Sequence, residues 1–147
     1  MPAPSQLVAL ARKAAAAHNL DPALVCAVIE QESSWNPWAM RYEPFFFAKY
    51  VAALYTNNKI TASEAYARSF SWGLMQVMGQ TARELGFDGT FLSALCDPEQ
   101  GLALGCKLLR KKLDALANDT HRALQAWNGG ANPTYAVQVL ARIAHYQ

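Results

Sequence analysis

The chain has 147 residues, the size of one ordinary domain. Hydrophobic residues make up 52% of it and charged residues 16%, which favours a compact core and excludes a disordered chain. The formal net charge of +2 is too small to indicate nucleic-acid binding, although it slightly favours contact with an anionic polymer.

The three cysteines, Cys26, Cys96 and Cys106, neither complete a disulfide framework nor form a CxxC pair, so we expect no metal and no cofactor. Cys26 and Cys106 fall in apolar helical patterns and are expected to be small buried hydrophobes. The N-terminal residues have no basic segment, and no stretch approaches about 18 apolar residues. We therefore expect a protein made in the cytoplasm, without a signal peptide or a membrane span.

Helical patterns account for most of the chain. The first helix is predicted from Ser5, as its cap, to about His18. The second begins with Asp21 as N-cap and Pro22 at the first helical position, and ends at Asn36-Pro37.

Residues 38–70 are irregular and rich in aromatic side chains, with a capping box at 61–64 before a short helix. The remaining predicted helices are 81–85, a long one from Asp97-Pro98, one from a Thr120 cap to Asn128-Gly129-Gly130, and a last one from Pro133. No β-alternation and no repeat is visible. The predicted class is all-α, in one domain over 1–147 with an insertion at about 38–70.

Glu32 is the most informative residue of the second helix. Val25, Val28, Ile29 and Glu32 follow the i, i+3, i+4, i+7 spacing of one apolar face, whereas Glu30 projects from the opposite face. Burial disfavours the ionised form of a carboxyl group, so the pKa of Glu32 should be raised. A carboxylic acid that stays protonated near neutral pH can give its proton to a leaving group.

Several motifs place polar side chains beside small or turn-forming residues at helix ends, as a polymer-binding cleft needs. They resemble the motifs of the soluble lytic transglycosylase family, whose catalytic domain is lysozyme-like. Glu-Ser-x-x-Asn-Pro is matched by Glu32, Ser33, Asn36 and Pro37, and Gly-Leu-Met-Gln by Gly73 to Gln76. Ala-Tyr-Asn-x-Gly appears as Ala126-Trp127-Asn128-Gly129-Gly130, and Tyr-x-x-x-Val-Leu as Tyr135, Val139 and Leu140. The motifs stand in the family's order and cover roughly residues 21–144.

This resemblance implies a lysozyme-like helical domain, similar to goose-type lysozyme, with a substrate cleft. It also implies cleavage of peptidoglycan glycan strands between N-acetylmuramic acid and N-acetylglucosamine, with formation of a 1,6-anhydro ring, by a monomer without a metal. Carried over residue by residue, Glu32 is the catalytic acid and base, and Tyr135 orients it. The implied substrate-binding residues are Ser33, Gly73, Met75, Gln76 and Asn128.

The chain departs from the common family pattern in two places. Gly79 stands where the family's Met-Pro-x-Thr-Ala continuation has proline, and the segment between Pro37 and Gly73 is unusually long. This looks like the variant carried by phages, which suggests an endolysin or a virion enzyme acting on the periplasmic cell wall. The aromatic insertion could form a wall or lid of the cleft, or it could be extra core packing.

Ordinary glycosidases use two carboxylates, and here the second is not obvious. Glu30 faces away, Asp21 and Asp97 are predicted caps, and Glu43 is the only other acid near the aromatic stretch, although Asp88 could fold into the cleft. A lone acid suits an internal nucleophile better than a water. Two alternatives stay open: a goose-type muramidase that hydrolyses the same bond, and a catalytically silent glycan-binding or structural module.

The individual residues also have simpler interpretations. Gln76 and Asn128 could be helix caps, while Met75 and Tyr135 could be packing residues. The three histidines, His18, His121 and His145, show no ligand spacing and are expected at the surface or at caps. The basic run 110–112 is expected to be a solvated face, with adhesion to an anionic wall as the alternative.

Overall fold

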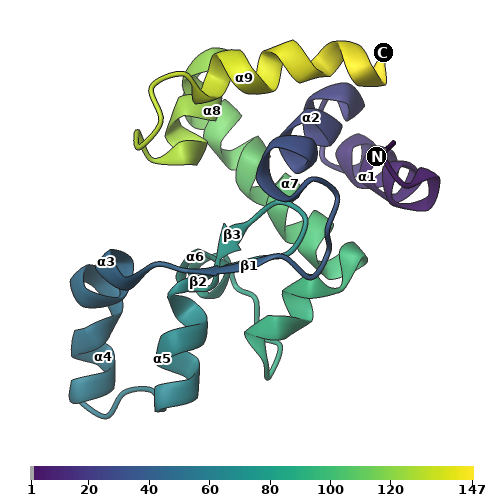
Figure 1. Cartoon of the computed structure of the whole chain (residues 1–147). Coiled ribbons are helices and arrows are strands. Elements are labelled where there is room, and N and C mark those ends of the chain that lie inside the picture. The colour runs from purple at the N-terminus through teal and green to yellow at the C-terminus, as the bar shows by residue number, and fades with distance from the viewer. Residues whose placement is uncertain (1) are drawn as a thin grey trace.

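The computed structural model describes residues 2–147. Its α-helices are α1 (Ser5–Ala17), α2 (Pro22–Ser33), α3 (Pro44–Phe46), α4 (Ala52–Thr56), α5 (Ala62–Arg68), α6 (Gly79–Glu84), α7 (Pro98–Ala115), α8 (Thr120–Asn128) and α9 (Tyr135–Arg142). A π-helix (Phe47–Val51) joins α3 to α4, and 3-10 helices occupy Leu92–Cys96 and Ile143–Tyr146. The strands are β1 (Met40–Tyr42), β2 (Phe70–Trp72) and β3 (Val77–Met78). The fold is mostly helical, as predicted (Figure 1).

The helix start signals are partly as predicted. The Asp21 carboxylate accepts a hydrogen bond from the Ala23 N–H at 2.9 Å, which confirms it as the cap of α2. Asp97 likewise caps α7. Two predicted caps are wrong: α1 is preceded by Pro4 rather than capped by Ser5, and α8 is capped by Asp119 instead of Thr120. The α2 helix ends at Ser33, because Ser34 is left-handed with φ 49°, before the predicted stop at Asn36-Pro37.

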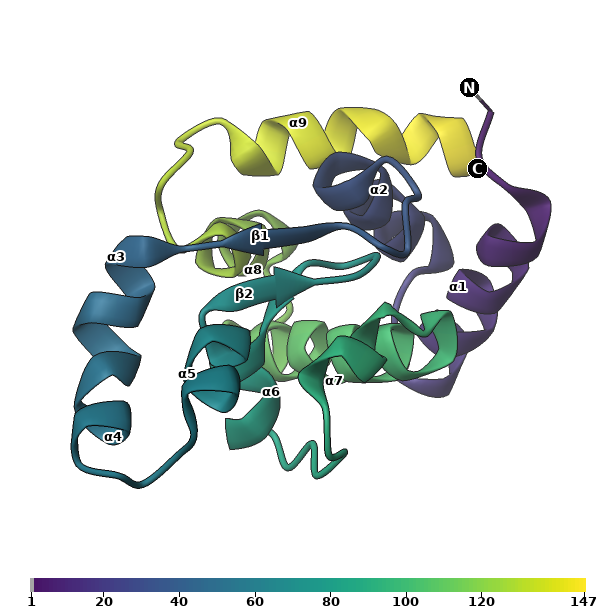
Figure 2. The same ribbon diagram turned by 60° about the horizontal axis from the view of Figure 1, so that its bottom comes forward.

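A small sheet is the feature that the helical patterns do not predict. Its order is β1-β2-β3, and both pairings are antiparallel, with Arg41 opposite Ser71 and Ser71 opposite Met78. The strands are only two or three residues long, too short to show an alternating pattern in the sequence. In Figure 2, α2 and α9 lie above this sheet and α5, α6 and α7 below it.

The core is built around α2. Residues 25–29 on this helix are all fully buried, because α1, α9 and the C-terminal 3-10 helix pack against it. Burying each large aliphatic side chain contributes about 1.5–3 kcal/mol. Cys26 and Cys106 are 0% exposed and free, which confirms them as buried hydrophobes, and burial raises the pKa of Cys26 to about 11.

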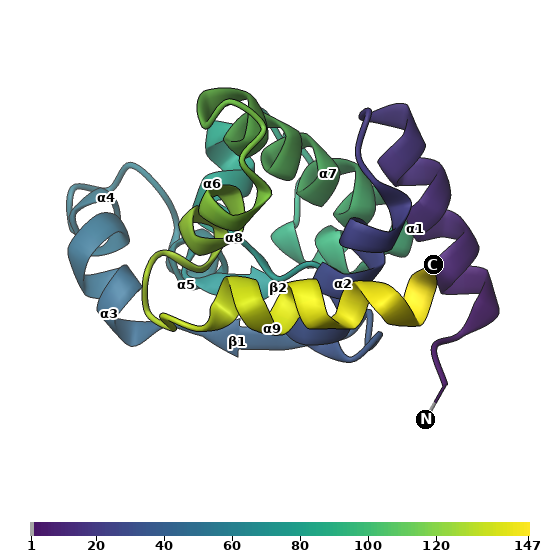
Figure 3. The ribbon, with the colours of Figure 1, turned by 90° about the horizontal axis from the view of Figure 1, so that it is seen from above.

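The aromatic insertion forms its own cluster at one end of the molecule, where α3 and α4 project away from α1 (Figure 3). Tyr42 lies 5.4–6.4 Å, between ring centroids, from Phe47, Tyr66 and Phe70. Phe45 stays 77% exposed. These rings therefore pack mainly on one another, and a role as a wall or lid of a cleft stays a prediction.

Candidate active site

Glu32 lies in the last turn of α2, where two aromatic side chains from other helices reach it. The Tyr135 hydroxyl, at the first residue of α9, donates to Glu32 Oε1 at 2.5 Å. The Trp127 indole Nε1–H, from α8, donates to the same oxygen at 3.2 Å. Tyr135 is 3% exposed, so its hydroxyl is held by packing. The predicted pair of acid and orienting tyrosine is thus brought together across 103 residues of sequence.

The environment raises the pKa of Glu32 above its ordinary value. Burial is the main cause, and it outweighs the hydrogen bonds from Tyr135 and Trp127 and the positive charge of Arg41, which all act downward. Burial and the neighbouring Glu32 likewise raise the pKa of Tyr135, so its hydroxyl stays a donor. A raised pKa favours the protonated form of Glu32, which a general acid needs.

The second carboxyl oxygen of Glu32 is left for chemistry. Within residues 2–147 no group donates a hydrogen bond to Oε2, and no buried side-chain oxygen in this range lacks a partner. Oε2 is therefore not completely buried and keeps some access to solvent. A proton on this oxygen can be transferred outward while Oε1 is held in place.

Trp127 is the site residue that sequence reasoning missed. The family motif has tyrosine at this position, and the sequence shows only a substitution between two aromatic residues. The contact depends on how α8 approaches the end of α2, which no local pattern reveals. A signal existed nonetheless, because a partly buried tryptophan usually needs a partner for its N–H.

The Gly73–Gln76 segment holds the sheet against the end of α2. The Ser33 hydroxyl lies 2.8 Å from the Leu74 carbonyl oxygen, and the Gln76 amide nitrogen donates to the carbonyls of Ala39 at 3.0 Å and Gly73 at 2.8 Å. Gln76 Oε1 accepts from the Ser71 hydroxyl at 2.8 Å. The side chains of Ser33 and Gln76 are thus engaged inside the protein, and their predicted contacts with substrate stay predictions.

Two glycines in and beside this segment are required by close packing. Gly73 has φ +71°, and a Cβ there would lie 2.5 Å from the Leu95 carbonyl oxygen. A Cβ at Gly79 would overlap the Ala67 carbonyl oxygen and lie 2.9 Å from Arg68 Cα, at the end of α5. The inserted helix α5 therefore explains why glycine replaces the family's proline at this position.

The Met75 side chain is packed in the core, and its predicted contact with substrate stays a prediction. Met75 is 1% exposed, and its sulfur occupies the space that a Cβ at Gly105 would fill. This side chain packs against α7, in agreement with the alternative interpretation as a packing residue.

Asn128 ends α8, before the left-handed Gly129. With its amide oxygen turned toward the following turn, Asn128 accepts from the N–H groups of Asn132 at 2.6 Å and Ala131 at 3.1 Å. This side chain orders the turn between α8 and α9 and so helps to place Tyr135. Its predicted contact with the glycan stays a prediction.

The other acids do not join Glu32. Glu30 pairs with Arg142 at 2.6 Å, on the opposite side of α2 as predicted. Asp21 and Asp97 cap helices. Glu43 Oε1 lies 3.0 Å from Arg41 Nε. Within residues 2–147 no group of three or more potential ligands could hold a metal, and no helix is long and apolar enough to cross a membrane.

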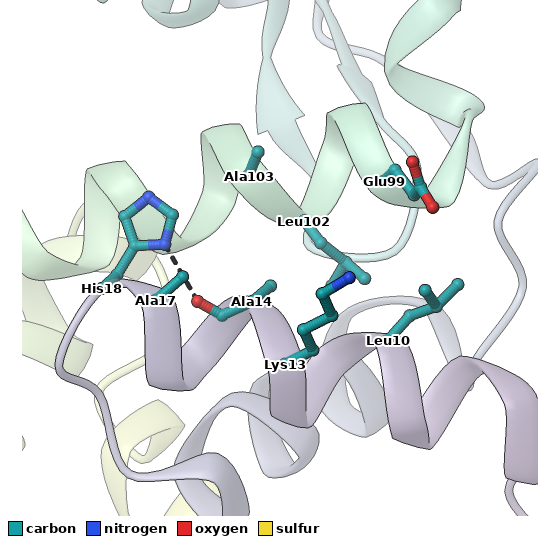
Figure 4. Close-up of a pocket in the computed structure, with 8 residues that line it drawn as sticks. All are labelled: Leu10, Lys13, Ala14, Ala17, His18, Glu99, Leu102 and Ala103. Carbon is teal, nitrogen blue, oxygen red and sulfur yellow. Dashed lines mark hydrogen bonds between the residues drawn. The ribbon is translucent and has the colours of Figure 1, made fainter.

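A separate hollow of about 240 Å³ lies between α1 and α7 (Figure 4). His18, which follows α1, points its Nδ1 at the Ala14 carbonyl oxygen at 2.9 Å, in keeping with its prediction as a cap residue. The hollow contains none of the predicted site residues. Its lining residues are Leu10, Lys13, Ala14, Ala17, His18, Glu99, Leu102 and Ala103.

Comparison with known proteins identifies the family of this chain. A family model described as the transglycosylase SLT domain matches residues 9–141. The chain belongs to the transglycosylase SLT family. A transglycosylase of Enterobacteria phage PRD1 is 34% identical over 119 residues, which are 81% of this chain and 33% of the phage protein. The chain thus spans about a third of the length of this curated relative. No solved structure shows a significant match to the chain.

Proposed function

We propose that this chain is a peptidoglycan lytic transglycosylase that cleaves the β-1,4 bond between N-acetylmuramic acid and N-acetylglucosamine. The observation that carries the proposal is the Tyr135–Glu32 hydrogen bond at 2.5 Å, which fixes a carboxyl group whose pKa is raised and whose second oxygen has no hydrogen-bond partner within residues 2–147. The family membership supports the same conclusion.

In the first step, the protonated Oε2 of Glu32 gives its proton to the glycosidic oxygen. The bond between this oxygen and C1 of the muramoyl residue breaks, and the N-acetylglucosamine portion leaves as an alcohol. Positive charge develops at C1 of the muramoyl ring. The Glu32 carboxylate that remains is stabilised by the hydrogen bonds that Oε1 accepts from Tyr135 and Trp127.

In the second step, the 6-hydroxyl of the muramoyl residue attacks C1 and loses its proton to the Glu32 carboxylate. The 1,6-anhydro ring closes and Glu32 regains its starting state, so one side chain serves as acid and then as base. An internal nucleophile needs no second carboxylate, which agrees with the separate engagement of Glu30 and Glu43.

Product analysis tests this proposal directly. Purified sacculi are digested with the chain, and the soluble muropeptides are weighed by mass spectrometry. We expect products one water lighter than their hydrolytic counterparts, since the anhydro ring consumes no water. Reducing muramoyl ends would overturn the proposal in favour of a goose-type muramidase, and binding without release of fragments would favour a silent module.

We further propose a phage setting, in which the chain is made in the cytoplasm and degrades the wall during lysis or entry. Support comes from the phage origin of its named relative and from the inserted segment. Expression in bacteria with and without a membrane-permeabilising holin tests the lysis role. Lysis only in the presence of holin is expected, and lysis without holin would contradict it.

A further inference from the structure

We propose that Arg41 on β1 is a specificity-determining residue that binds a carboxylate of the muramoyl side group. This inference rests on the proposed function and extends it to a residue in the inserted segment. The muramoyl residue carries a lactyl carboxyl group, which is either free or linked to a peptide that has carboxylates of its own. Both sources offer the planar anion that a guanidinium binds with two parallel hydrogen bonds.

The Arg41 guanidinium has donors to spare. Its Nε lies 3.0 Å from Glu43 Oε1, whereas its terminal amino groups have no hydrogen-bond partner within residues 2–147, and the side chain is 75% exposed. Most other arginines of the chain are engaged at these terminal groups, whereas Arg122 resembles Arg41 in having no side-chain hydrogen bond within residues 2–147. One terminal amino group of Arg83 donates to two backbone carbonyls and the other to the Glu64 carboxylate. A terminal amino group of Arg142 donates to Glu30.

Glu43 also orients Arg41 for such a contact. The ion-pair contact at Nε keeps one edge of the guanidinium beside Glu43 and leaves the terminal amino groups free. The Glu43 carboxylate is itself only 35% exposed. An exposed ion pair of this kind adds little stability, so its main consequence is the direction in which Arg41 points.

The backbone beneath Arg41 is held firmly. Arg41 pairs with Ser71 in the sheet, the Gly73 N–H donates to the Ala39 carbonyl at 2.8 Å, and the Gln76 amide donates to the same carbonyl at 3.0 Å. A cation on a braced strand loses less conformational freedom on binding than one on a mobile loop.

Arg41 also lies on the strand beside the end of α2. The Gly73 N–H donates to the Ala39 carbonyl, two residues before Arg41, and the hydroxyl of Ser33, which follows Glu32, lies 2.8 Å from the Leu74 carbonyl oxygen. The positive charge of Arg41 also lowers the pKa of Glu32. A substrate whose scissile bond reaches Glu32 therefore brings its lactyl group into the field of Arg41. When that carboxylate neutralises Arg41, the downward effect of Arg41 on the acid weakens, so binding of the anionic group favours the protonated Glu32.

Binding measurements in the Glu32→Gln background, where turnover is removed, test this inference. The probes are a muramoyl oligosaccharide with free lactyl carboxylates, the same oligosaccharide with these groups converted to neutral amides, and the peptide-bearing form. We expect Arg41→Gln to weaken binding of the free-carboxylate probe about tenfold, which is the effect of one charge-assisted contact. Binding of the neutral probe should not change. A larger loss with the peptide-bearing probe would assign the contact to the peptide carboxylate.

Arg122→Gln is the matched control. Arg122 is also an exposed arginine, and its charge is not among those that act on Glu32. The role of Arg41 would be overturned if Arg122→Gln weakened binding of the charged probe as much as Arg41→Gln does. It would also be overturned if Arg41→Gln weakened binding of the charged and neutral probes equally, or weakened neither. If the wild-type chain releases anhydro products while Arg41→Gln binds normally, only this inference fails. If no probe binds any variant, the proposed function fails with it.

Discussion

Two carboxyl groups two residues apart on α2 have opposite environments. Glu30 receives the guanidinium of Arg142 at 2.6 Å, the hydroxyl of Tyr146 at 2.5 Å and a contact with His145 Nδ1 at 3.1 Å. Within residues 2–147, the hydrogen bonds to Glu32 come only from neutral donors. Burial raises the pKa of both, but for Glu30 the hydrogen bonds from Tyr146, His145 and Arg142 outweigh it and lower the pKa, whereas for Glu32 burial prevails.

The difference shows how one helix supplies a structural anion on one face and an acid on the other. Both oxygens of Glu30 are engaged, which locks it as a carboxylate. Glu32 has one oxygen held and one open. What separates the two roles is the deeper burial of Glu32, the charge of the partners and the oxygen left unpaired.

The largest expected effect comes from removing the acid. Glu32→Gln keeps the shape and the Oε1 acceptor but has no proton to transfer, so turnover of sacculi should fall roughly 10³-fold. Solubilisation of labelled sacculi measures this. Glu30→Gln is the matched control and should keep nearly all activity. Full activity in Glu32→Gln would remove this residue from the mechanism.

The next effect is that of the tyrosine. Tyr135→Phe removes the 2.5 Å hydrogen bond to Glu32, so kcat should fall roughly 10- to 100-fold, the loss expected for a strong contact to a charged group. This bond lowers the pKa of Glu32, so its loss should move the alkaline limb of the kcat profile to higher pH. Tyr146→Phe, which removes the equivalent bond to Glu30, should leave that limb in place. Identical shifts in both variants would contradict the separation of the two faces.

The sequence predicts the acid better than its surroundings. The apolar spacing of Val25, Val28 and Ile29 places Glu32 on the buried face, and the family motif points to Tyr135. Neither reveals Trp127 as a donor, because that contact depends on the angle between α8 and α2. The partners of Glu30 come from the last residues of the chain, and no local pattern brings those to α2.

The region around the sheet is the least predictable part. Its strands are too short to show alternation, so the sequence does not reveal that Gln76 lies in the turn between β2 and β3. In the structure, the Gln76 side chain links Ser71 on β2 to the Ala39 carbonyl just before β1. Met75 fits a family motif that says nothing of burial, whereas its surroundings at Gly105 come from a helix about 30 residues further along. Fold class and the buried face of a regular helix follow from local periodicity, but the exposure of side chains in the turns between helices does not.

A smaller effect, on stability, should separate the two acids further. Glu30→Gln removes the anion that Arg142 and Tyr146 bind, so the free energy of unfolding at pH 7 should fall by about 1–3 kcal/mol. The pKa of Glu30 is lower in the folded than in the unfolded chain, so its ionised form stabilises the fold above the unfolded-state value of about 4.3. This contribution is lost as the pH falls through the folded-state pKa. Urea unfolding should therefore show a large difference in the free energy of unfolding between Glu30→Gln and wild type at pH 7, and a small one near pH 3. The same difference at both pH values would count against the ionic role of Glu30.

The smallest expected effect has the opposite sign. The pKa of Glu32 is raised in the folded chain, so its stabilising contribution is full below the unfolded-state pKa and is lost as the pH rises through the folded-state value. At pH 7 the unfolded chain ionises Glu32, whereas the folded chain disfavours this ionisation, so Glu32 lowers the stability of the wild type. Glu32→Gln supplies a permanently neutral group that can still accept hydrogen bonds from Tyr135 and Trp127. The variant should be more stable than wild type by about 1 kcal/mol at pH 7, or roughly 3 °C in Tm, and no more stable below about pH 4. Thermal unfolding of the two chains across this pH range measures the gain. A stability loss at pH 7, as expected for Glu30→Gln, would mean that Glu32 is bound as an anion and that the contrast between the two faces of α2 is wrong.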